Sequence, residues 1–471
     1  MANRNVEIIQ EIISELNALQ NSKDPPDTRQ VGPIPFPRLL SGKNNAQILV
    51  NKRIELLIQD LGRKTYNDAL KVNHIATLEE WQPAIRSFFG DELTGAIDLT
   101  NEQVAAKTIR KKLFSYRKQK IEDAQQTEWA FPCTIFSEAK LDPFKIGPVR
   151  IETREDWLIR QIERGRISKV SKRRLERQWA NGNANRPRKA TDESLFEGEI
   201  SRTVKDHKFM ITVELENLLP EAALKRANML ANLTLAAIAC LWTNPSKALR
   251  NMFIAVDWTK TSITGMLISE KRYFPFYEPI RLPGNYIDQN LMYGFIDDNK
   301  EYWEGVTNIF NFLAMSRPDN VKKELHDILS QALMFFQRGC AETSDLMAII
   351  NLANALDILS KGVLVKEQAD DNKSKGRVRG IVIMIQGLLG YKQDSNITRD
   401  GRTVYEIIDE IYSDARSRTV HGTSERYHLD WQELREIATY ITHRCLTQAI
   451  GRAGELERAT CMKHLFYEQQ D

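Results

Sequence analysis

The sequence lacks the patterns that would assign it to several common classes of protein. Its five cysteines lie far apart, their total is odd, and no Cys-x-x-Cys pair occurs. Neither a disulfide framework nor a zinc site is therefore indicated, and a reducing cytoplasm fits best. The chain also has no glycine-rich phosphate loop, no Gly-x-Ser-x-Gly motif and no carboxylate cluster at metal-binding spacing. We expect it to use neither a metal nor another cofactor.

Long apolar runs are also missing. The N-terminus does not show the basic-then-apolar pattern of a signal peptide. The most apolar stretch, Ala222 to Trp242, contains Lys225 and Arg226, so it predicts a buried helix and not a membrane span. With 42% hydrophobic and 27% charged residues and a net charge of +3, the composition is that of an ordinary soluble protein. We expect a cytoplasmic protein with no membrane partner.

The 471 residues are enough for two to four domains. Asn5 to Leu19 has the periodicity of an amphipathic helix, and helical patterns resume from about Ala46 to Leu70 after a proline-rich arm. Capping-box patterns at Thr77 and Thr100 predict two further helix starts. The fold class we predict is α+β, multidomain and mainly helical. Its regions are an N-terminal helical region (1–125), a connector with a basic segment (126–199), a small α+β domain (200–300) and a helical bundle (301–471).

Several short segments between residues 126 and 300 have strand patterns. Prolines and glycines separate short apolar runs between Trp129 and Val149, which indicates short strands or an irregular connector. His207 to Leu215 alternates like a strand, and a helix is predicted to follow from Pro220. Asn251 to Trp258 and Ile263 to Ser269 then resemble the two strands of a hairpin.

A basic block follows the connector. Lys and Arg dominate from Arg160 to Lys189, with Trp157 and Trp179 at its flanks. Such residues neutralise phosphates without reading sequence, while aromatic rings can stack on unpaired bases. We predict that the block contacts RNA, chiefly through Lys172, Arg173, Arg174 and Arg177. The alternative is a solvated basic helix, which we favour for a similar cluster between Arg110 and Lys120.

After Tyr302 the pattern is wholly helical and predicts a bundle. Asp357 lies beside the apolar stripe that contains Ile350 and Leu356. A carboxylate in that place needs a partner, and we predict Arg416; the alternative is an exposed edge position. Lys366 to Gly380 is polar and charged, which predicts a loop. His326, His428, His443 and His464 are isolated, so we expect surface or core histidines.

The most informative stretch runs from Thr403 to Gly422. Its apolar residues recur at helical spacing, and the predicted helix ends in Arg416, Ser417, Arg418 and His421. Arginine matches phosphate oxygens with a fixed fork of donors, and histidine exchanges protons near neutral pH. RNA carries its 2′-hydroxyl beside the phosphate, so these residue types suit its cleavage without a metal. The alternative is a helix end whose cations complement the macrodipole.

Helical spacing limits what a single chain can do. In a regular α-helix, five positions place Arg416 and His421 roughly 140° apart. One such helix does not aim both side chains at the same phosphate unless its end unwinds. Two helices packed across a two-fold axis would pool both residues from each copy.

The run from Ile411 to Gly422 resembles the Arg-x4-His signature of the HEPN ribonucleases. Its aromatic lead-in and its His-Gly ending are most similar to the ApeA-like branch. The upstream segment Ala355 to Leu359 resembles the family helix that carries an acidic residue, with Asp357 where glutamate is common. Ser417 follows the arginine, where Asn, Asp or His is frequent in the family. The resemblance covers about the last third of the chain.

This resemblance implies a metal-independent endoribonuclease with Arg416, His421, Asp357 and Ser417 as catalytic residues and Arg418 as an RNA contact. It further implies a homodimer with the site at the bundle interface, and products with 2′,3′-cyclic phosphate and 5′-hydroxyl ends. The implied substrate is RNA, including tRNA. The implied role is that of a toxin in antiviral defence by abortive infection, released by a phage-derived or nucleic-acid trigger. The alternatives are a catalytically inactive nucleic-acid-binding scaffold and a module that only dimerises.

Overall fold

The computed structural model shows a mainly helical chain with small antiparallel sheets, which confirms the α+β class. Two compact units are present. Unit 1 comprises Met1–Thr127, Leu215–Arg226 and Met315–Arg317, and unit 2 comprises Glu128–Glu214, Ala227–Ala314 and Pro318–Asp471. The structure describes residues 2–21, 38–43, 46–66, 76–95, 100–124, 126–137, 141–181, 197–198, 200–201, 203–204, 207–254, 262–269, 272–279, 289–315, 322–361, 363, 373–420 and 431–467.

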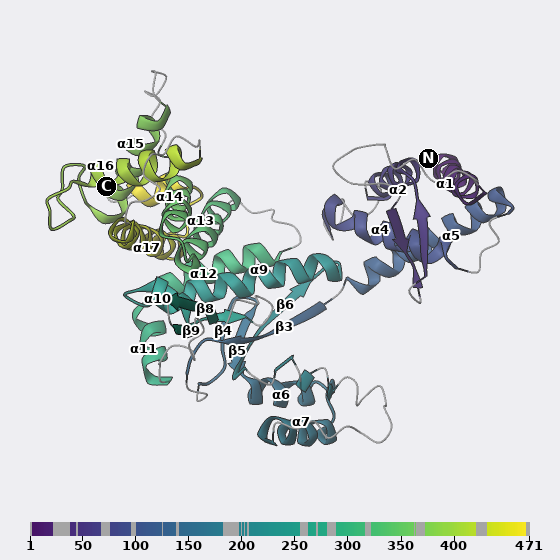
Figure 1. The fold of residues 1–471 in the computed structure, drawn as a ribbon, viewed down its shortest axis with the longest axis horizontal. Coiled ribbons are helices and arrows are strands. Elements are labelled where there is room, and N and C mark those ends of the chain that lie inside the picture. Colours follow the sequence, from purple (N-terminus) through teal and green to yellow (C-terminus); the bar gives the residue numbers. More distant parts are fainter. Residues whose placement is uncertain are drawn as a thin grey trace. The chain divides into compact units, whose positions relative to one another are not determined.

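Unit 1 packs helices around one apolar core. Its helices are α1 (Ala2–Asn21), α2 (Lys52–Thr65), α4 (Leu78–Leu93) and α5 (Glu102–Asp123), grouped around the paired strands β1 (Arg38–Ser41) and β2 (Gln47–Val50) (Figure 1). Ile9, Ile12 and Trp81 are fully buried, and the Trp81 indole donates to the Thr65 hydroxyl at 2.9 Å. The predicted first helix and the capping box between Thr77 and Glu80 are both present.

Two details of unit 1 differ from the sequence prediction. Residues 47–50 form a strand and not the start of a helix, because α2 begins only after the cap at Asn51. The next predicted cap is displaced by one residue, since Asn101 and not Thr100 caps α5. The first error arises because a short apolar run fits either periodicity, and the second because Thr and Asn are both favoured N-caps. The proline-rich arm lies outside the described residues.

The main sheet of unit 2 has five strands in the order β4-β5-β6-β3-β7. They are β3 (Gln126–Thr134), β4 (Phe144–Ile146), β5 (Val149–Thr153), β6 (Phe209–Glu216) and β7 (Phe253–Ile254). Helix α6 (Arg154–Glu163) leaves β5 directly, capped by Thr153, and α7 (Lys169–Asn181) follows it. The strand predicted at His207–Leu215 is confirmed as β6, which pairs with β5.

The predicted hairpin is wrong in its pairing. β7 pairs with β3, and β8 (Ser262–Ser269) pairs with β9 (Arg272–Pro279). The proline in the middle of β9 made that segment a poor strand candidate by sequence. The helix α9 (Pro220–Ala239) is as predicted, and α10 (Pro245–Arg250) links it to β7.

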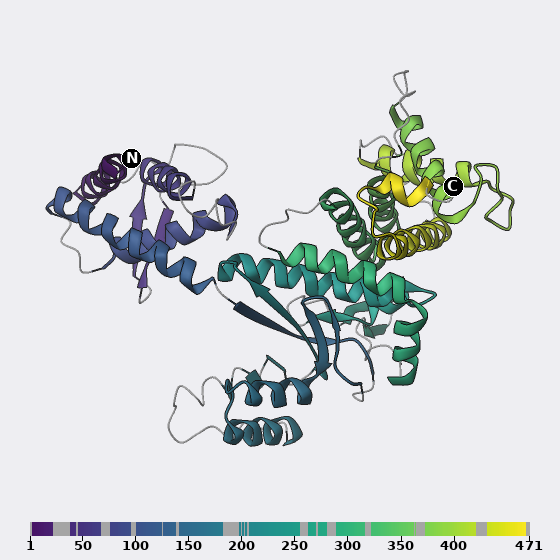
Figure 2. The ribbon, with the colours of Figure 1, turned by 180° about the vertical axis from the view of Figure 1, so that it is seen from behind.

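The C-terminal part of unit 2 is a helical bundle. It contains α12 (Lys300–Ala314), α13 (Lys323–Ala341), α14 (Asp345–Leu359), α15 (Lys373–Leu389), α16 (Val404–Asp409), α17 (Gln432–Glu455) and α18 (Met462–Tyr467), with α11 (Gln289–Asp298) before it. Helices α13, α14 and α17 lie side by side in both ribbon views (Figures 1 and 2). Ile350 and Leu356 of the predicted apolar stripe are buried, and so are Leu329 and Phe336 on α13.

One prediction for the bundle is wrong. The segment Lys366–Gly380 was expected to be a loop, but α15 begins at Lys373. Val378, Ile381 and Ile385 are buried, so an apolar face anchors the helix despite its charged first turns. Residues 366–372 lie outside the described part of the chain.

No helix within the described ranges combines the length and the apolar character needed to cross a membrane. The cysteines are free thiols, and Cys133, Cys240, Cys340 and Cys445 are buried. Burial raises the pKa of the Cys340 thiol to about 12, so this thiol stays protonated and unreactive near neutral pH.

Candidate functional site

The helix that carries Arg416 is not a regular α-helix at its end. Thr403 caps α16 through a capping box with Glu406, and from Glu410 to Arg418 the chain forms a π-helix. A π-helix bonds residues five apart and is frequent at functional sites. The angle of roughly 140° estimated from α-helical geometry therefore does not apply within Glu410–Arg418. The sequence analysis missed this change of geometry.

Three contacts hold the Arg416 side chain. Its Nε donates to Asn354 Oδ1 at 2.6 Å, and its Nη2 lies 3.5 Å from Asp357 Oδ2. The guanidinium also stacks over the Tyr412 ring, 4.6 Å from the centroid. Asn354 and Asp357 stand three apart on α14, and Tyr412 lies four residues before Arg416. These spacings put each pair on one helix face.

Asp357 lies between two arginines. Arg377, on α15, places its Nη1 3.6 Å from Asp357 Oδ1. The Asp357 side chain is 20% exposed, and its Oδ1 is buried without a hydrogen bond. The pairing expected between Asp357 and Arg416 is thus present, and a second cation shares the carboxylate.

Tyr412 forms the apolar floor of this cluster. The residue is 6% exposed. Burial raises the pKa of its phenol, the Asp357 carboxylate raises it further, and Arg416 and Arg377 oppose the change. At neutral pH the phenol is therefore protonated, and its ring offers a neutral π-face to the guanidinium.

The structure describes only some of the other predicted site residues. Ser417 is on the π-helix and partly exposed, and the backbone of Arg418 ends the π-helix. The Arg418 side chain and the whole of His421 lie outside the described residues. The catalytic roles of Arg416, Asp357, Ser417 and His421 stay predictions.

Sequence reasoning missed Asn354 and Arg377 as members of this cluster. Asn354 was detectable, because it lies three residues before Asp357 on the same predicted helix. Arg377 was not, because its segment was assigned to a loop. Only the packing of α15 beside α14 brings it to the carboxylate.

The basic block divides into two parts with different environments. In the first, Arg160 is only 12% exposed and pairs with two buried carboxylates, Glu152 and Glu128. Its Nη1 lies 2.9 Å from Glu128 Oε1, and its Nη2 donates to the Thr212 hydroxyl at 3.1 Å. Arg160 is therefore part of the fold and not a nucleic-acid contact.

Arg164 and Arg166 extend the same network. Both pair with Glu128, and Arg164 also reaches Glu214 at 2.7 Å. Burial raises the pKa of Glu128, but Arg160, Arg166 and the Gln161 amide outweigh it, so the net pKa is lowered. The carboxylates come from strands β3 and β6, distant in sequence from the block, so the sequence appeared to leave these arginines unopposed.

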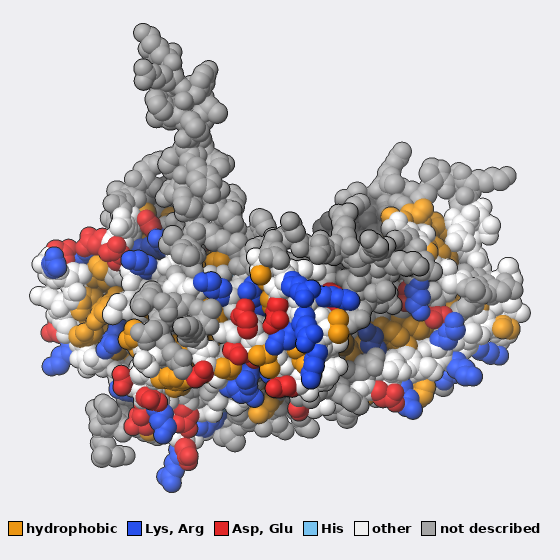
Figure 3. Space-filling view, turned by 90° about the horizontal axis from the view of Figure 1, so that it is seen from below, with side chains coloured by type: hydrophobic (Ala, Val, Ile, Leu, Met, Phe, Trp, Pro, Cys, Tyr) orange, Lys and Arg blue, Asp and Glu red, His pale blue; other side chains and the backbone are white. Residues whose placement is uncertain are grey.

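The second part of the block is helix α7, whose cations face solvent. Lys172 lies 3.6 Å from Glu176 and Arg174 lies 3.3 Å from Glu197. Arg173 and Arg177 are exposed and form no ion pair with any described residue. Figure 3, which views the side that carries α6 and α7, shows a group of Lys and Arg side chains there. The role of these four residues as RNA contacts stays a prediction.

The two tryptophans of the block do not offer free rings. Trp157 is buried in a small core with Leu158 and Leu175, and Arg154 covers the Trp179 ring at 4.4 Å. Stacking on bases is therefore wrong for Trp157, and for Trp179, which is partly buried, it stays a prediction. Apolar packing of α6 against α7 uses both rings.

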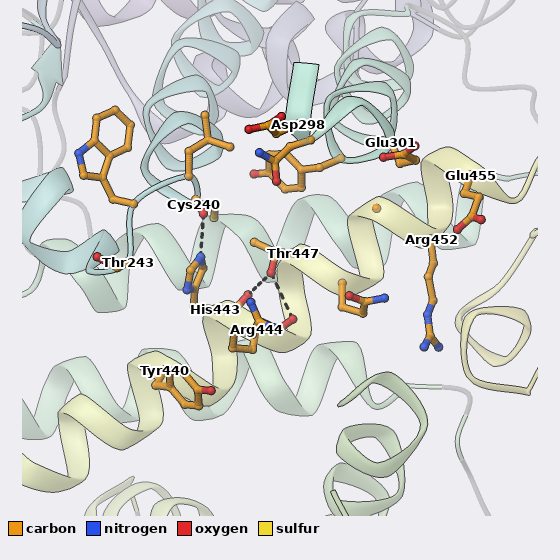
Figure 4. Close-up of a pocket in the computed structure, with 16 residues that line it drawn as sticks. Cys240, Thr243, Asp298, Glu301, Tyr440, His443, Arg444, Thr447, Arg452 and Glu455 are labelled. Atoms are coloured by element: carbon orange, nitrogen blue, oxygen red, sulfur yellow. Dashed lines mark hydrogen bonds between the residues drawn. The ribbon is translucent and has the colours of Figure 1, made fainter. Parts of the chain in front are cut away.

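Unit 2 also contains a cavity of about 580 Å³ between α12, α17 and the end of α9. Figure 4 shows Asp298, Glu301 and Glu455 at one side of it, while His443 points to the Cys240 carbonyl and donates to it at 2.8 Å. Burial lowers the pKa of His443, opposed by that hydrogen bond. His443 is a buried core histidine, as expected. The Arg416 cluster does not line this cavity.

In chemical terms, the Arg416 cluster presents guanidinium donors on a supported helix end, next to one carboxylate that does not saturate them. Such an arrangement binds an anion with two oxygens, such as a phosphate or a carboxylate. Comparisons with protein-family models, with curated proteins and with solved structures found no match to this chain.

Proposed function

We propose that this protein is a metal-independent endoribonuclease of the HEPN type. The observation that carries the proposal is the fixed position of Arg416, which Asn354, Asp357 and Tyr412 hold at the end of the segment that continues into the Arg-x4-His motif. An arginine fixed in this way loses little conformational entropy when it binds a phosphate.

The mechanism follows from the chemistry of RNA. Arg416 neutralises the charge that develops on the phosphate as the 2′-oxygen attacks it. His421 exchanges the proton between the attacking 2′-hydroxyl and the leaving 5′-oxygen. Asp357 orients Arg416, and Ser417 and Arg418 bind the flanking backbone. The 2′-oxygen forms a bond to phosphorus as the bond to the 5′-oxygen breaks, which leaves a 2′,3′-cyclic phosphate and a 5′-hydroxyl.

The resemblance also supports a homodimer with a shared site, and a toxic effector role in antiviral defence. In that role the rest of the chain would restrain the nuclease until a trigger binds. The alternative is an inactive scaffold that binds nucleic acid or dimerises. The exposed arginines of α7 favour binding, and Asp357 in place of the common glutamate departs from the family pattern.

The test is direct cleavage of RNA by purified protein in the presence of a metal chelator. Wild type should generate cyclic-phosphate ends from total tRNA or another RNA. Arg416→Ala and His421→Ala should each lose at least about 100-fold of this activity. Arg399→Ala, which changes an exposed arginine of the same unit, is the matched control and should remain active.

Growth of expressing cells gives a second readout. Wild type should arrest growth and deplete intact RNA, and His421→Ala should not. Equal toxicity of the two would remove the nuclease assignment. Salt-sensitive RNA binding without cleavage would instead support the scaffold.

A further inference from the structure

Among the described residues, Arg377 is the one cation of the Asp357 cluster that lies outside the Arg-x4-His segment. It comes from the first turns of α15, whereas Arg416 comes from the π-helix and Asp357 from α14. The two guanidiniums approach opposite oxygens of one carboxylate, at 3.6 Å for Arg377 and 3.5 Å for Arg416. Three separate helical elements thus meet at a single charged group.

The charges of this cluster do not balance. Two permanent positive charges face one negative charge, and neither arginine meets the carboxylate at the short distance of a strong charge-assisted hydrogen bond. Asp357 Oδ1 is buried and accepts no hydrogen bond. An ion pair that served only stability would close these distances, since a buried acceptor without a partner costs free energy.

The donors that remain are accessible. The side chain of Arg377 is 45% exposed and that of Arg416 is 26% exposed. Arg377 makes no other ion pair with a described residue, so within the described part of the chain most of its five N–H donors meet no carboxylate. An incoming anion would meet two forks of donors with one carboxylate behind them.

We propose that Arg377 is a second phosphate-binding residue of this site, which holds the RNA backbone beside Arg416. Asp357 then has two roles, because it positions both guanidiniums and prevents their mutual repulsion. This inference rests on the proposed ribonuclease function but adds a residue outside its motif. It also gives each chain two arginines for the substrate.

The test measures binding separately from cleavage. The probe is a fluorescent 2′-O-methyl RNA oligonucleotide, which binds but lacks the hydroxyl needed for cleavage. Arg377→Gln should weaken its affinity about tenfold and lower the salt slope of binding by about one. Arg377→Lys should keep the slope and lose less affinity, since it retains the charge but not the fork.

Arg379→Gln is the matched control. Arg379 is exposed on the same helix two residues further on, which turns it away from Arg377, and it forms no ion pair with a described residue. It should leave binding unchanged. All three variants should have the melting temperature of wild type, because the side chains of the cluster bury little apolar surface.

The outcomes separate the two proposals. The inference is overturned if Arg377→Gln binds the probe like wild type. It is also overturned if this variant loses no more affinity for the probe than Arg379→Gln does. If wild type does not bind the probe at all, the inference falls as well. If wild type binds but cleaves no RNA, the ribonuclease proposal fails while the binding difference still decides the role of Arg377.

Discussion

Two clusters of arginine and carboxylate in unit 2 differ in how completely their charges are satisfied. Around Arg160, the buried carboxylates Glu128 and Glu152 accept several hydrogen bonds. Those that Arg160 donates are no longer than 3.1 Å between nitrogen and oxygen. Around Asp357, two arginines share one carboxylate at 3.5 and 3.6 Å. Arg160 is saturated by its own carboxylates, whereas Arg377 and Arg416 meet the Asp357 carboxylate only at longer distances.

The comparison shows why a count of basic residues is a poor guide to nucleic-acid binding. Arg160 belongs to the basic block of the sequence but pairs with Glu128 and Glu152, two carboxylates on strands of the main sheet. Arg377 was assigned to a loop but stands beside the predicted catalytic arginine. Saturation of the hydrogen bonds, and not local charge density, distinguishes an arginine of the fold from one of a site.

The largest effect is expected when the saturated cluster is broken. Arg160→Met leaves Glu152 and Glu128 buried without their main partner, and should lower the free energy of unfolding by about 3 kcal/mol. Arg164→Met is the matched control, because its side chain is 37% exposed, and should cost less than about 1 kcal/mol. Urea unfolding measures both. Equal losses would show that the Arg160 cluster is not buried in solution.

The unsaturated cluster should respond in the opposite way. Asp357→Asn should lower RNA cleavage about tenfold, because Arg416 loses its charged orienting partner, while the melting temperature changes little. Asp345→Asn, on the same helix, should instead affect stability, since Asp345 pairs at 2.7 Å with the buried Arg435. Kinetics and thermal melting on both variants make the comparison. A large fall in melting temperature with normal cleavage in Asp357→Asn would assign Asp357 a structural role.

The pH dependence of stability should report the saturated cluster. The pKa of Glu128 is lowered in the folded protein, so the unfolded chain binds a proton first as the pH falls. The stabilisation is complete above the unfolded pKa of about 4.3 and is lost as pH falls through the folded pKa. The difference in unfolding free energy between wild type and Glu128→Gln, measured from pH 7 downward, should therefore shrink. A constant difference would mean that Glu128 is not charged in the fold.

The smallest effect is expected on α7. Replacing Arg173 and Arg177 together with Gln should reduce the salt slope of RNA binding by about one, uniformly across sequences. Lys107 and Lys111 on α5 have the same spacing, are exposed and form no ion pair with a described residue. Their double Gln variant is the control and should not change the slope. Identical slopes for both variants and wild type would make α7 a solvated face.

The sequence by itself determined the features that depend on neighbours along the chain. The first helix, the cap at Thr77 and the apolar stripe through Ile350 and Leu356 follow from periodicity and capping, which are local. The proximity of Asp357 to Arg416 was also predictable, because a carboxylate beside a buried stripe needs a cationic partner.

Only the tertiary structure decided the rest. It paired β7 with β3, made the first turns of α15 helical through the burial of Val378, and placed Arg160 of α6 beside Glu128 of β3. It also brought Arg377 to Asp357. Each of these depends on how separate helices and strands pack against one another. Local pattern contains no information about such contacts, because their free energy arises from burial and charge pairing that exist only after the elements pack.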